Sequence, residues 1–138
     1  MQVIKYVFQG HGDDRGQLVA LEETKDIPFH IKRVYNIYKT SKDVVRGHCA
    51  YRNNDEIMIC TYGSCKVRLD DGLFTKEVSL ENPYEGLYVP SYMWREIFDF
   101  SEDAVLSVLA SNVYDEKNYV RDYNEFLRLA EHARKCEP

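Results

Sequence analysis

Short apolar and β-branched runs, each bounded by turn residues, fill the first 110 residues of the chain. The run 66–70 alternates Lys, Val, Arg, Leu and Asp, which is typical of a strand with one buried face. Asp71-Gly72 separates two such runs and predicts a hairpin, and Tyr62-Gly63 is a second candidate for one. The strands that we expect are 3–8, 17–21, 31–38, 44–51, 56–61, 64–70, 73–80, 87–90, 94–99 and 104–110.

The end of the chain has a different period. Between Asp115 and Lys135 apolar side chains recur at i, i+3, i+4 and i+7, and acidic residues come first. This spacing predicts an amphipathic helix over roughly 116–134. A series of short strands followed by one helix, without βαβ alternation, predicts an antiparallel sandwich or barrel. No linker, repeat or low-complexity segment divides the chain, so we expect one domain over residues 1–138.

Composition narrows the functional classes. With 138 residues, of which 44% are hydrophobic and 30% charged, the chain can bury a core and is not disordered. Its formal net charge of −5 argues against a nucleic-acid binder that neutralises phosphates. No apolar run approaches the roughly 18 residues of a membrane span, and no signal peptide is recognisable, so we expect no membrane partner and a cytoplasmic location. Four cysteines without a CxxC pair argue against a disulfide framework.

The sequence around Cys49 has a spacing that suggests a pocket. After Gly47, Cys49 and Tyr51 are two residues apart and therefore face the same side of a strand. With Glu56 five residues later, this spacing resembles the first cupin motif, and 86–90 (GLYVP) resembles the second. Metal-binding cupins carry His-x-His at the first motif, and because no imidazole stands there we expect no metal. The alternative is that the two side chains only fill a barrel.

Charged residues near these strands suggest an anionic ligand. An arginine inside a barrel is costly without a counter-charge, and a phosphate or diphosphate suits bidentate guanidinium contacts. The alternative is that each arginine pairs with a carboxylate of the chain. His48 adjoins the pocket pair, but on a regular strand it points away, and only a local bulge would turn it inward. The arginines in strand or strand-edge contexts beside aromatic residues are Arg15, Arg33, Arg46 and Arg95.

Several blocks of the sequence resemble the WxcM-like cupins, which include the dTDP-4-keto-6-deoxyglucose 3,4-ketoisomerases of bacterial surface-polysaccharide synthesis. The resemblance implies an antiparallel cupin-type jelly roll and a homodimer with N-terminal strands exchanged or paired between subunits. It also implies a thymidine diphosphate sugar in the barrel mouth, with no metal or other cofactor. The resemblance covers about residues 12–128, in the blocks IPFHIKRVYNIY (27–38), RGHCAYR (46–52), ICTYGSCKVRLDDG (59–72), EGLYVPSYMWREIFDFS (85–101) and VLASNVYDEKNYVRDYNEF (108–126).

A 3,4-ketoisomerase must move a proton from C3 to C4 of a keto sugar and stabilise the enediolate between these steps. The family's two expected proton-transfer histidines are replaced here by Cys49 and Tyr51. The candidate catalytic residues are therefore Tyr51, Cys49 and Tyr35, and Tyr51 is our first choice because it is long enough to reach a sugar carbon. A phenol with a pKa of about 10 is a weak base, so this choice requires Arg95 or Arg15 to lower the pKa of Tyr51.

The resemblance also assigns roles to the arginines, because the family's arginine positions are kept at Arg33, Arg46 and Arg95. We expect Arg33 and Arg46 to hold the diphosphate, and Arg15 and Arg95 to lie nearer the sugar. Three functions remain open at this point. They are a 3,4-ketoisomerase with a substituted proton shuttle, an enzyme of the same pathway with another reaction such as epimerisation, and a non-catalytic cupin that binds nucleotide sugars.

Overall fold

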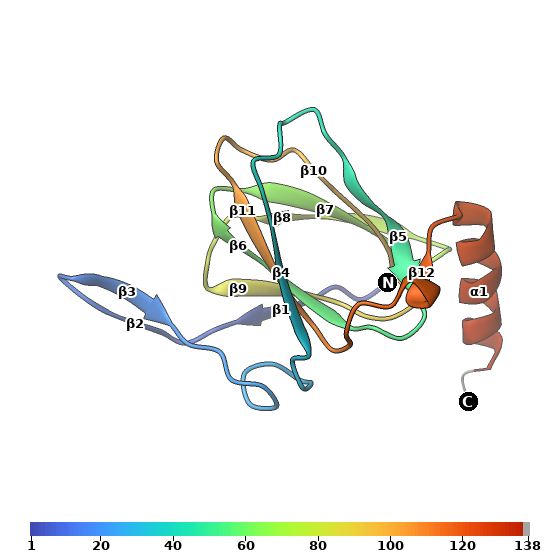
Figure 1. The fold of residues 1–138 in the computed structure, drawn as a ribbon, viewed down its shortest axis with the longest axis horizontal. Helices are drawn as coiled ribbons and strands as arrows, with labels where there is room; N and C mark the ends of the chain where they lie inside the picture. The colour runs from blue at the N-terminus through green and yellow to red at the C-terminus, as the bar shows by residue number, and fades with distance from the viewer. Residues whose placement is uncertain (137–138) are drawn as a thin grey trace.

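A computed structural model describes residues 1–136 and contains two five-stranded antiparallel sheets that face each other (Figure 1). Its elements are β1 (Ile4–Val7), β2 (Gly10–Asp13), β3 (Gly16–Val19), β4 (Arg33–Tyr38), β5 (Arg46–Tyr51), β6 (Glu56–Tyr62), β7 (Cys65–Asp70), β8 (Thr75–Leu80), β9 (Glu85–Val89), β10 (Trp94–Phe98), β11 (Val105–Ala110), the 3-10 helix η1 (Glu116–Asn118), β12 (Tyr119–Val120) and the α-helix α1 (Tyr123–Lys135). The first sheet has the order β1-β9-β6-β11-β4, and the second has the order β12-β5-β10-β7-β8. The expected antiparallel jelly roll with one C-terminal α-helix is confirmed.

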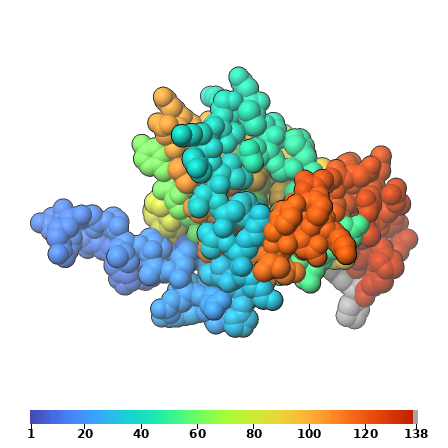
Figure 2. All heavy atoms as spheres, viewed as in Figure 1, coloured from blue at the N-terminus to red at the C-terminus, as the bar shows by residue number. Residues whose placement is uncertain are grey.

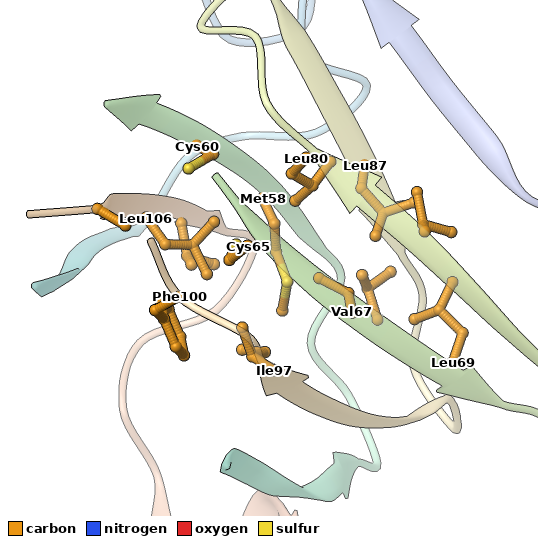
Figure 3. Packing of buried hydrophobic residues seen from close by; sticks show 14 residues of the cluster. Met58, Cys60, Cys65, Val67, Leu69, Leu80, Leu87, Ile97, Phe100 and Leu106 are labelled. Carbon is orange, nitrogen blue, oxygen red and sulfur yellow. The ribbon is translucent and has the colours of Figure 1, made fainter. Parts of the chain in front are cut away.

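Inward-facing residues alternate with outward-facing ones along each strand. The space between the sheets is apolar because most of the inward-facing residues are hydrophobic. β11 buries Leu106, Val108 and Ala110, and the residues between them are only partly buried. Figure 3 shows Met58 of β6 and Val67 of β7, which come from different sheets, in one apolar cluster. Burying each such side chain contributes roughly 1.5–3 kcal/mol, so this cluster holds the two sheets together.

The expected strands are confirmed with ends that shift by one or two residues, but β2 and β12 are not among them. The Asp71-Gly72 hairpin is confirmed, since β7 and β8 pair on either side of it. The Tyr62-Gly63 hairpin is wrong, because β6 and β7 lie in different sheets. Gly63 has a φ of 72°, and there the chain crosses from one sheet to the other. A glycine with left-handed backbone serves a crossover as well as a hairpin, so the sequence signal is the same for both.

The helix predicted over 116–134 is wrong in its first part, since α1 begins at Tyr123. Tyr119 and Val120 instead pair with β5 as a short strand, in which Tyr119 is partly buried and Val120 is buried. The helix starts where it does because the Asp122 side chain caps it, accepting a hydrogen bond of 3.0 Å from the backbone N–H of Glu125. From that point the helix packs its apolar stripe against the buried face of β5 and β10.

The hairpin of β2 and β3 projects from the sandwich as an arm (Figures 1 and 2). Its residues are exposed apart from Val19, and Leu18 is among the exposed large apolar side chains. Beyond the arm the chain returns along the outer face of the first sheet, where Ile27 packs against Ile57 and Ile59. The outer face of this sheet is therefore covered by the returning chain near Ile27, whereas the arm stands clear of the sandwich.

Residues 1–136 contain no helix that is long and apolar enough to cross a membrane. The cytoplasmic location expected from the sequence stays a prediction. The single domain expected over 1–138 also stays a prediction, and its last two residues, 137 and 138, lie outside the described residues.

Truncating a core side chain should test the role of the inter-sheet cluster. Leu106 is fully buried, so Leu106→Ala should lower the free energy of unfolding by about 2–5 kcal/mol through lost burial and the cavity left behind. Urea denaturation followed by circular dichroism measures this change. The control Leu73→Ala, at a residue 63% exposed in the turn between β7 and β8, should cost less than about 1 kcal/mol. Equal losses for the two variants would contradict the assignment of the core.

Candidate active site

A cavity of about 240 Å³ opens between β4, β5 and β10 and is closed on one side by residues 119–121. It brings together six of the seven residues expected from the sequence, and Arg15 is the one that it does not include. Tyr119 and Arg121 also line it, although sequence reasoning did not single them out. The expected residues that line the cavity are Arg33, Tyr35, Arg46, Cys49, Tyr51 and Arg95.

Strand alternation delivers these side chains to one place. On β4, Arg33 and Tyr35 are partly buried and line the cavity, whereas Val34 between them is exposed. On β5, Cys49 and Tyr51 line the cavity, and Ala50 between them packs under α1. The prediction that Cys49 and Tyr51 share one strand face is therefore confirmed.

A bulge in β5 shapes the cavity wall beside Cys49. Arg95 of β10 pairs with Cys49, but the next residue, Glu96, pairs with Gly47, so one residue of β5 is left over. This residue is His48, which has a φ of 53°. It is exposed and does not line the cavity, as expected for a side chain on the other face. The structure contains the bulge that could have turned His48 toward the cavity, but the His48 side chain does not line the cavity.

The base of the cavity is a buried network centred on Glu56. Arg95 Nη1 donates to Glu56 Oε1 at 2.6 Å, and both side chains are almost completely buried. The Tyr35 hydroxyl donates to Glu56 Oε2 at 2.8 Å, and Asn54 Nδ2 donates to the same oxygen at 3.2 Å. Arg95 Nη2 donates to the carbonyl of Met93 at 2.9 Å. Arg95 Nε is buried and has no hydrogen-bond partner within residues 1–136, so a donor is available there.

Burial reverses the pKa shift that the sequence led us to expect for Tyr51. Burial raises the pKa of Tyr51, and the negative charge of Glu56 raises it further. Arg95 lies near, with its guanidinium carbon 4.7 Å from the centre of the Tyr51 ring, but its charge is paired with Glu56. Arg15 does not line the cavity. The expectation that an arginine lowers the pKa of Tyr51 is therefore wrong, and the Tyr51 hydroxyl is a proton donor at neutral pH.

The other two candidates for proton transfer are also neutral. Burial and the Glu56 carboxylate raise the pKa of Tyr35. Burial raises the pKa of the Cys49 thiol as well, and the positive charge of Arg95 offsets only part of this effect. Neither side chain is therefore a ready base without a partner that removes its proton.

Arg121 lies at the rim and was missed because it fell inside the predicted helix. Its guanidinium stacks over the Tyr119 ring at 4.3 Å and donates to both carboxylate oxygens of Glu116, at 2.9 and 3.1 Å. A signal for it existed, since Asp122 followed three residues later by Glu125 is a capping-box spacing. That spacing starts the helix after Arg121 and leaves this residue in a loop.

The two remaining arginine expectations have different outcomes. Arg46, the first residue of β5, lines the cavity and is exposed to solvent. Arg15 lies on the arm, pairs with Asp13 at 2.6 Å, and has a side chain that is 87% exposed. Within one chain, Arg15 is therefore separate from the other expected sugar-binding residues.

No group of three or more His, Cys, Asp or Glu side chains within residues 1–136 is placed to hold a metal ion. The residues that line the cavity include no histidine. The expectation that the protein works without a metal stays a prediction.

Comparisons with known proteins find sugar isomerases that are similar to this chain over most of its length. The family model FdtA, described as WxcM-like, C-terminal, matches residues 1–131. A TDP-4-oxo-6-deoxy-alpha-D-glucose-3,4-oxoisomerase of Aneurinibacillus thermoaerophilus is 49% identical over 114 residues, which are 83% of this chain and 82% of the relative.

Solved structures resemble the chain over nearly its whole length. A 3,4-ketoisomerase from Helicobacter canadensis is 44% identical with a TM-score of 0.92, covering 95% of this chain and 98% of that one. QdtA, a sugar 3,4-ketoisomerase from Thermoanaerobacterium thermosaccharolyticum solved in complex with TDP, is 41% identical with a TM-score of 0.93, covering 95% and 96%.

Thiol labelling should test the electrostatics of the cavity. Cys136 is exposed, whereas Cys49 is buried with a raised pKa, so iodoacetamide at pH 7.5 should alkylate Cys136 long before Cys49. Peptide mass spectrometry at timed intervals identifies the labelled residue. In the control variant Cys136→Ser the fast label should disappear. Rapid alkylation of Cys49 would reveal a thiolate in the cavity and contradict this description.

Proposed function

This chain belongs to the WxcM-like family, and from that premise we propose that it is a sugar 3,4-ketoisomerase whose substrate is TDP-4-keto-6-deoxyglucose. The family match over residues 1–131 and the 49% identity to a TDP-4-oxo-6-deoxy-alpha-D-glucose-3,4-oxoisomerase support the reaction. The relative solved with TDP supports the nucleotide part of the substrate. The product sugar would enter deoxyaminosugar or O-antigen synthesis, as the resemblance implies.

The observation that carries this proposal is the unbalanced positive charge of the cavity. Of its four arginines, two form ion pairs within residues 1–136, Arg95 with Glu56 and Arg121 with Glu116. Arg33 and Arg46 line the same cavity and form none there, and guanidinium groups without a counter-charge favour an anion. A nucleotide sugar carries one negative charge on each of its two phosphates, which matches these two arginines.

The aromatic and polar groups suit the sugar. Arg95 Nε is a buried donor without a partner, and the hydroxyls of Tyr51 and Tyr35 are neutral donors. The Tyr35 hydrogen is already donated to Glu56, so Arg95 Nε and the Tyr51 hydroxyl are the groups that can stabilise the oxygen charge that develops when a ketone becomes an enediolate. We therefore propose that Arg95 and Tyr51 bind the C3 and C4 oxygens, while Cys49 and Tyr35 lie beside the carbons that exchange a proton.

A homodimer would account for Arg15 and for the arm. Arg15 could reach a cavity only in a second copy, because in its own chain it lies on the projecting hairpin. Large apolar side chains are exposed near the arm and on the outer face of β4, including Val7 at 74%, Leu18 at 58% and Val34 at 57%. The cavity of about 240 Å³ is also below the roughly 300–1,000 Å³ of most ligand pockets, so a second copy would complete its wall.

Incubation with TDP-4-keto-6-deoxyglucose, followed by NMR of the sugar carbons, tests the proposed activity. We expect the ketone signal to move from C4 to C3. A 4-keto product with inverted configuration at another carbon would instead indicate an epimerase. Binding of the nucleotide sugar without any change in its carbons would indicate a binding protein. The experiment must distinguish this outcome because the raised pKa values of Tyr51 and Cys49 make both groups poor bases.

Replacing the unpaired arginines should weaken ligand binding. A charge-assisted hydrogen bond contributes about 1.5–3 kcal/mol, so Arg33→Ala or Arg46→Ala should weaken TDP binding by roughly 10- to 150-fold. Isothermal titration calorimetry measures the dissociation constant. Arg128→Ala is a matched control, because Arg128 is exposed on α1 and does not line the cavity. Unchanged binding by both cavity variants would remove the diphosphate assignment.

A further inference from the structure

A buried hydrogen bond connects the cavity to a carboxylate that does not line it. Tyr35 lines the cavity, and its hydroxyl donates to Glu56 Oε2 at 2.8 Å. Glu56 itself is fully buried at the start of β6, on the inward-facing side of the strand. A proton that reaches the Tyr35 oxygen from the cavity therefore has a carboxylate directly behind it.

Glu56 is held in one position by three donors from three parts of the chain. Arg95 of β10 contacts Oε1, while Tyr35 of β4 and Asn54 contact Oε2. Because both oxygens are engaged, the carboxylate cannot rotate away from Tyr35 without breaking buried hydrogen bonds. The acceptor atom for a proton from Tyr35 is thus fixed as Oε2.

The side chains of residues 1–136 that line the cavity include no carboxylate and no imidazole. The cavity lining contains no histidine, and burial raises the pKa values of Tyr51 and Cys49. The second carboxylate that contacts a lining residue is Glu116, which lies at the exposed rim and binds Arg121 through both oxygens. Glu56 is therefore the carboxylate with a direct hydrogen bond to a lining hydroxyl within residues 1–136.

We propose that Glu56 is the terminal acceptor for the proton taken from C3 of the sugar, and that Tyr35 relays this proton between substrate and carboxylate. This inference rests on the proposed ketoisomerase function and supplies the proton acceptor that Cys49 and Tyr51 cannot provide. Tyr35 touches the substrate, and Glu56 acts through Tyr35.

The relay balances protons and electrons without a further reactant. The C3–H bond breaks, its proton joins the Tyr35 oxygen, and the Tyr35 hydroxyl proton moves to Glu56 Oε2. The electron pair of the broken bond forms the C3=C4 double bond, and the C4 carbonyl pair moves onto its oxygen. In the second half a proton passes from the C3 hydroxyl to the C4 oxygen, the C3 carbonyl forms, and the relay returns its proton to C4.

The charges of the site support this step. Because the proton arrives as another leaves, Tyr35 never carries a full negative charge, which its buried position would oppose. When Oε2 of Glu56 becomes protonated, Oε1 still accepts from Arg95 Nη1. The negative charge passes to the enediolate oxygens, and the unpartnered Nε of Arg95 is a donor for them. Arg95 therefore faces one anion throughout the reaction.

The variant Glu56→Gln tests the relay, because it keeps the shape of the side chain and an oxygen for Arg95. We expect TDP binding and KM to stay within about threefold, while kcat falls by about 10²–10⁴. Exchange of the C3 proton in D2O, measured by NMR, should fall by the same factor, a change that a purely structural role would not produce with binding intact. Glu85→Gln, on β9 away from the cavity, is the matched control and should leave all three quantities unchanged.

A second variant covers the case in which Glu56→Gln does not fold. Tyr35→Phe retains the Glu56–Arg95 ion pair and should lose turnover and C3 exchange to a similar extent. The double variant Glu56→Gln with Tyr35→Phe should be about as slow as the slower of the two single variants, because the two groups act as one unit. Full turnover in Glu56→Gln, or losses that multiply in the double variant, would overturn the relay while the isomerase function stands. A parent protein that binds TDP but neither turns over nor exchanges C3 would overturn both.

Discussion

The candidate active site is built on the buried ion pair of Glu56 and Arg95, which makes the interior beside the cavity polar. This ion pair joins β6 of the first sheet to β10 of the second, and both side chains are almost fully buried. Two charges in a low-dielectric interior must be paired and hydrogen-bonded, because removing either partner of such a pair costs about 3–5 kcal/mol. The interior beside the cavity is therefore polar, whereas the inter-sheet cluster around Met58 and Val67 is apolar.

The fold was predictable wherever the local pattern decides the outcome. Alternation along 66–70 predicts a strand, because an extended backbone places its apolar residues on one buried face, and the short apolar run 104–110 between turn residues predicts another. The start of the helix was not predictable from periodicity, since Tyr119 and Val120 fit a helical stripe as well as they fit the edge of β5. Likewise, Gly63 marks a turn in the sequence, but only the packing of the sheets determines that the chain crosses there.

The candidate site was predictable in its residues more than in its chemistry. The alternation of side chains along a strand is enough to bring Cys49 and Tyr51 to one face. The resemblance to the WxcM-like family identifies Arg33, Arg46 and Arg95 as candidate ligand-binding residues. The direction of the pKa shifts required the three-dimensional structure, because Glu56 of β6 contacts Tyr35 of β4 past the strand β11 that lies between them in the first sheet. Sequence alone cannot reveal that Arg95 is already paired and is thus unavailable to lower the pKa of Tyr51.

The bulge of β5 at His48 places different constraints on its two neighbours, Gly47 and Cys49. Gly47 has a φ of 91°, and a side-chain carbon there would lie 2.8 Å from the carbonyl oxygen of Arg95, so this position tolerates only glycine. Cys49, two residues later, pairs with Arg95 in regular register, and its side chain lines the cavity. A substitution at position 49 would therefore change the chemistry of the cavity wall, whereas a substitution at position 47 would disturb the backbone that gives this wall its shape.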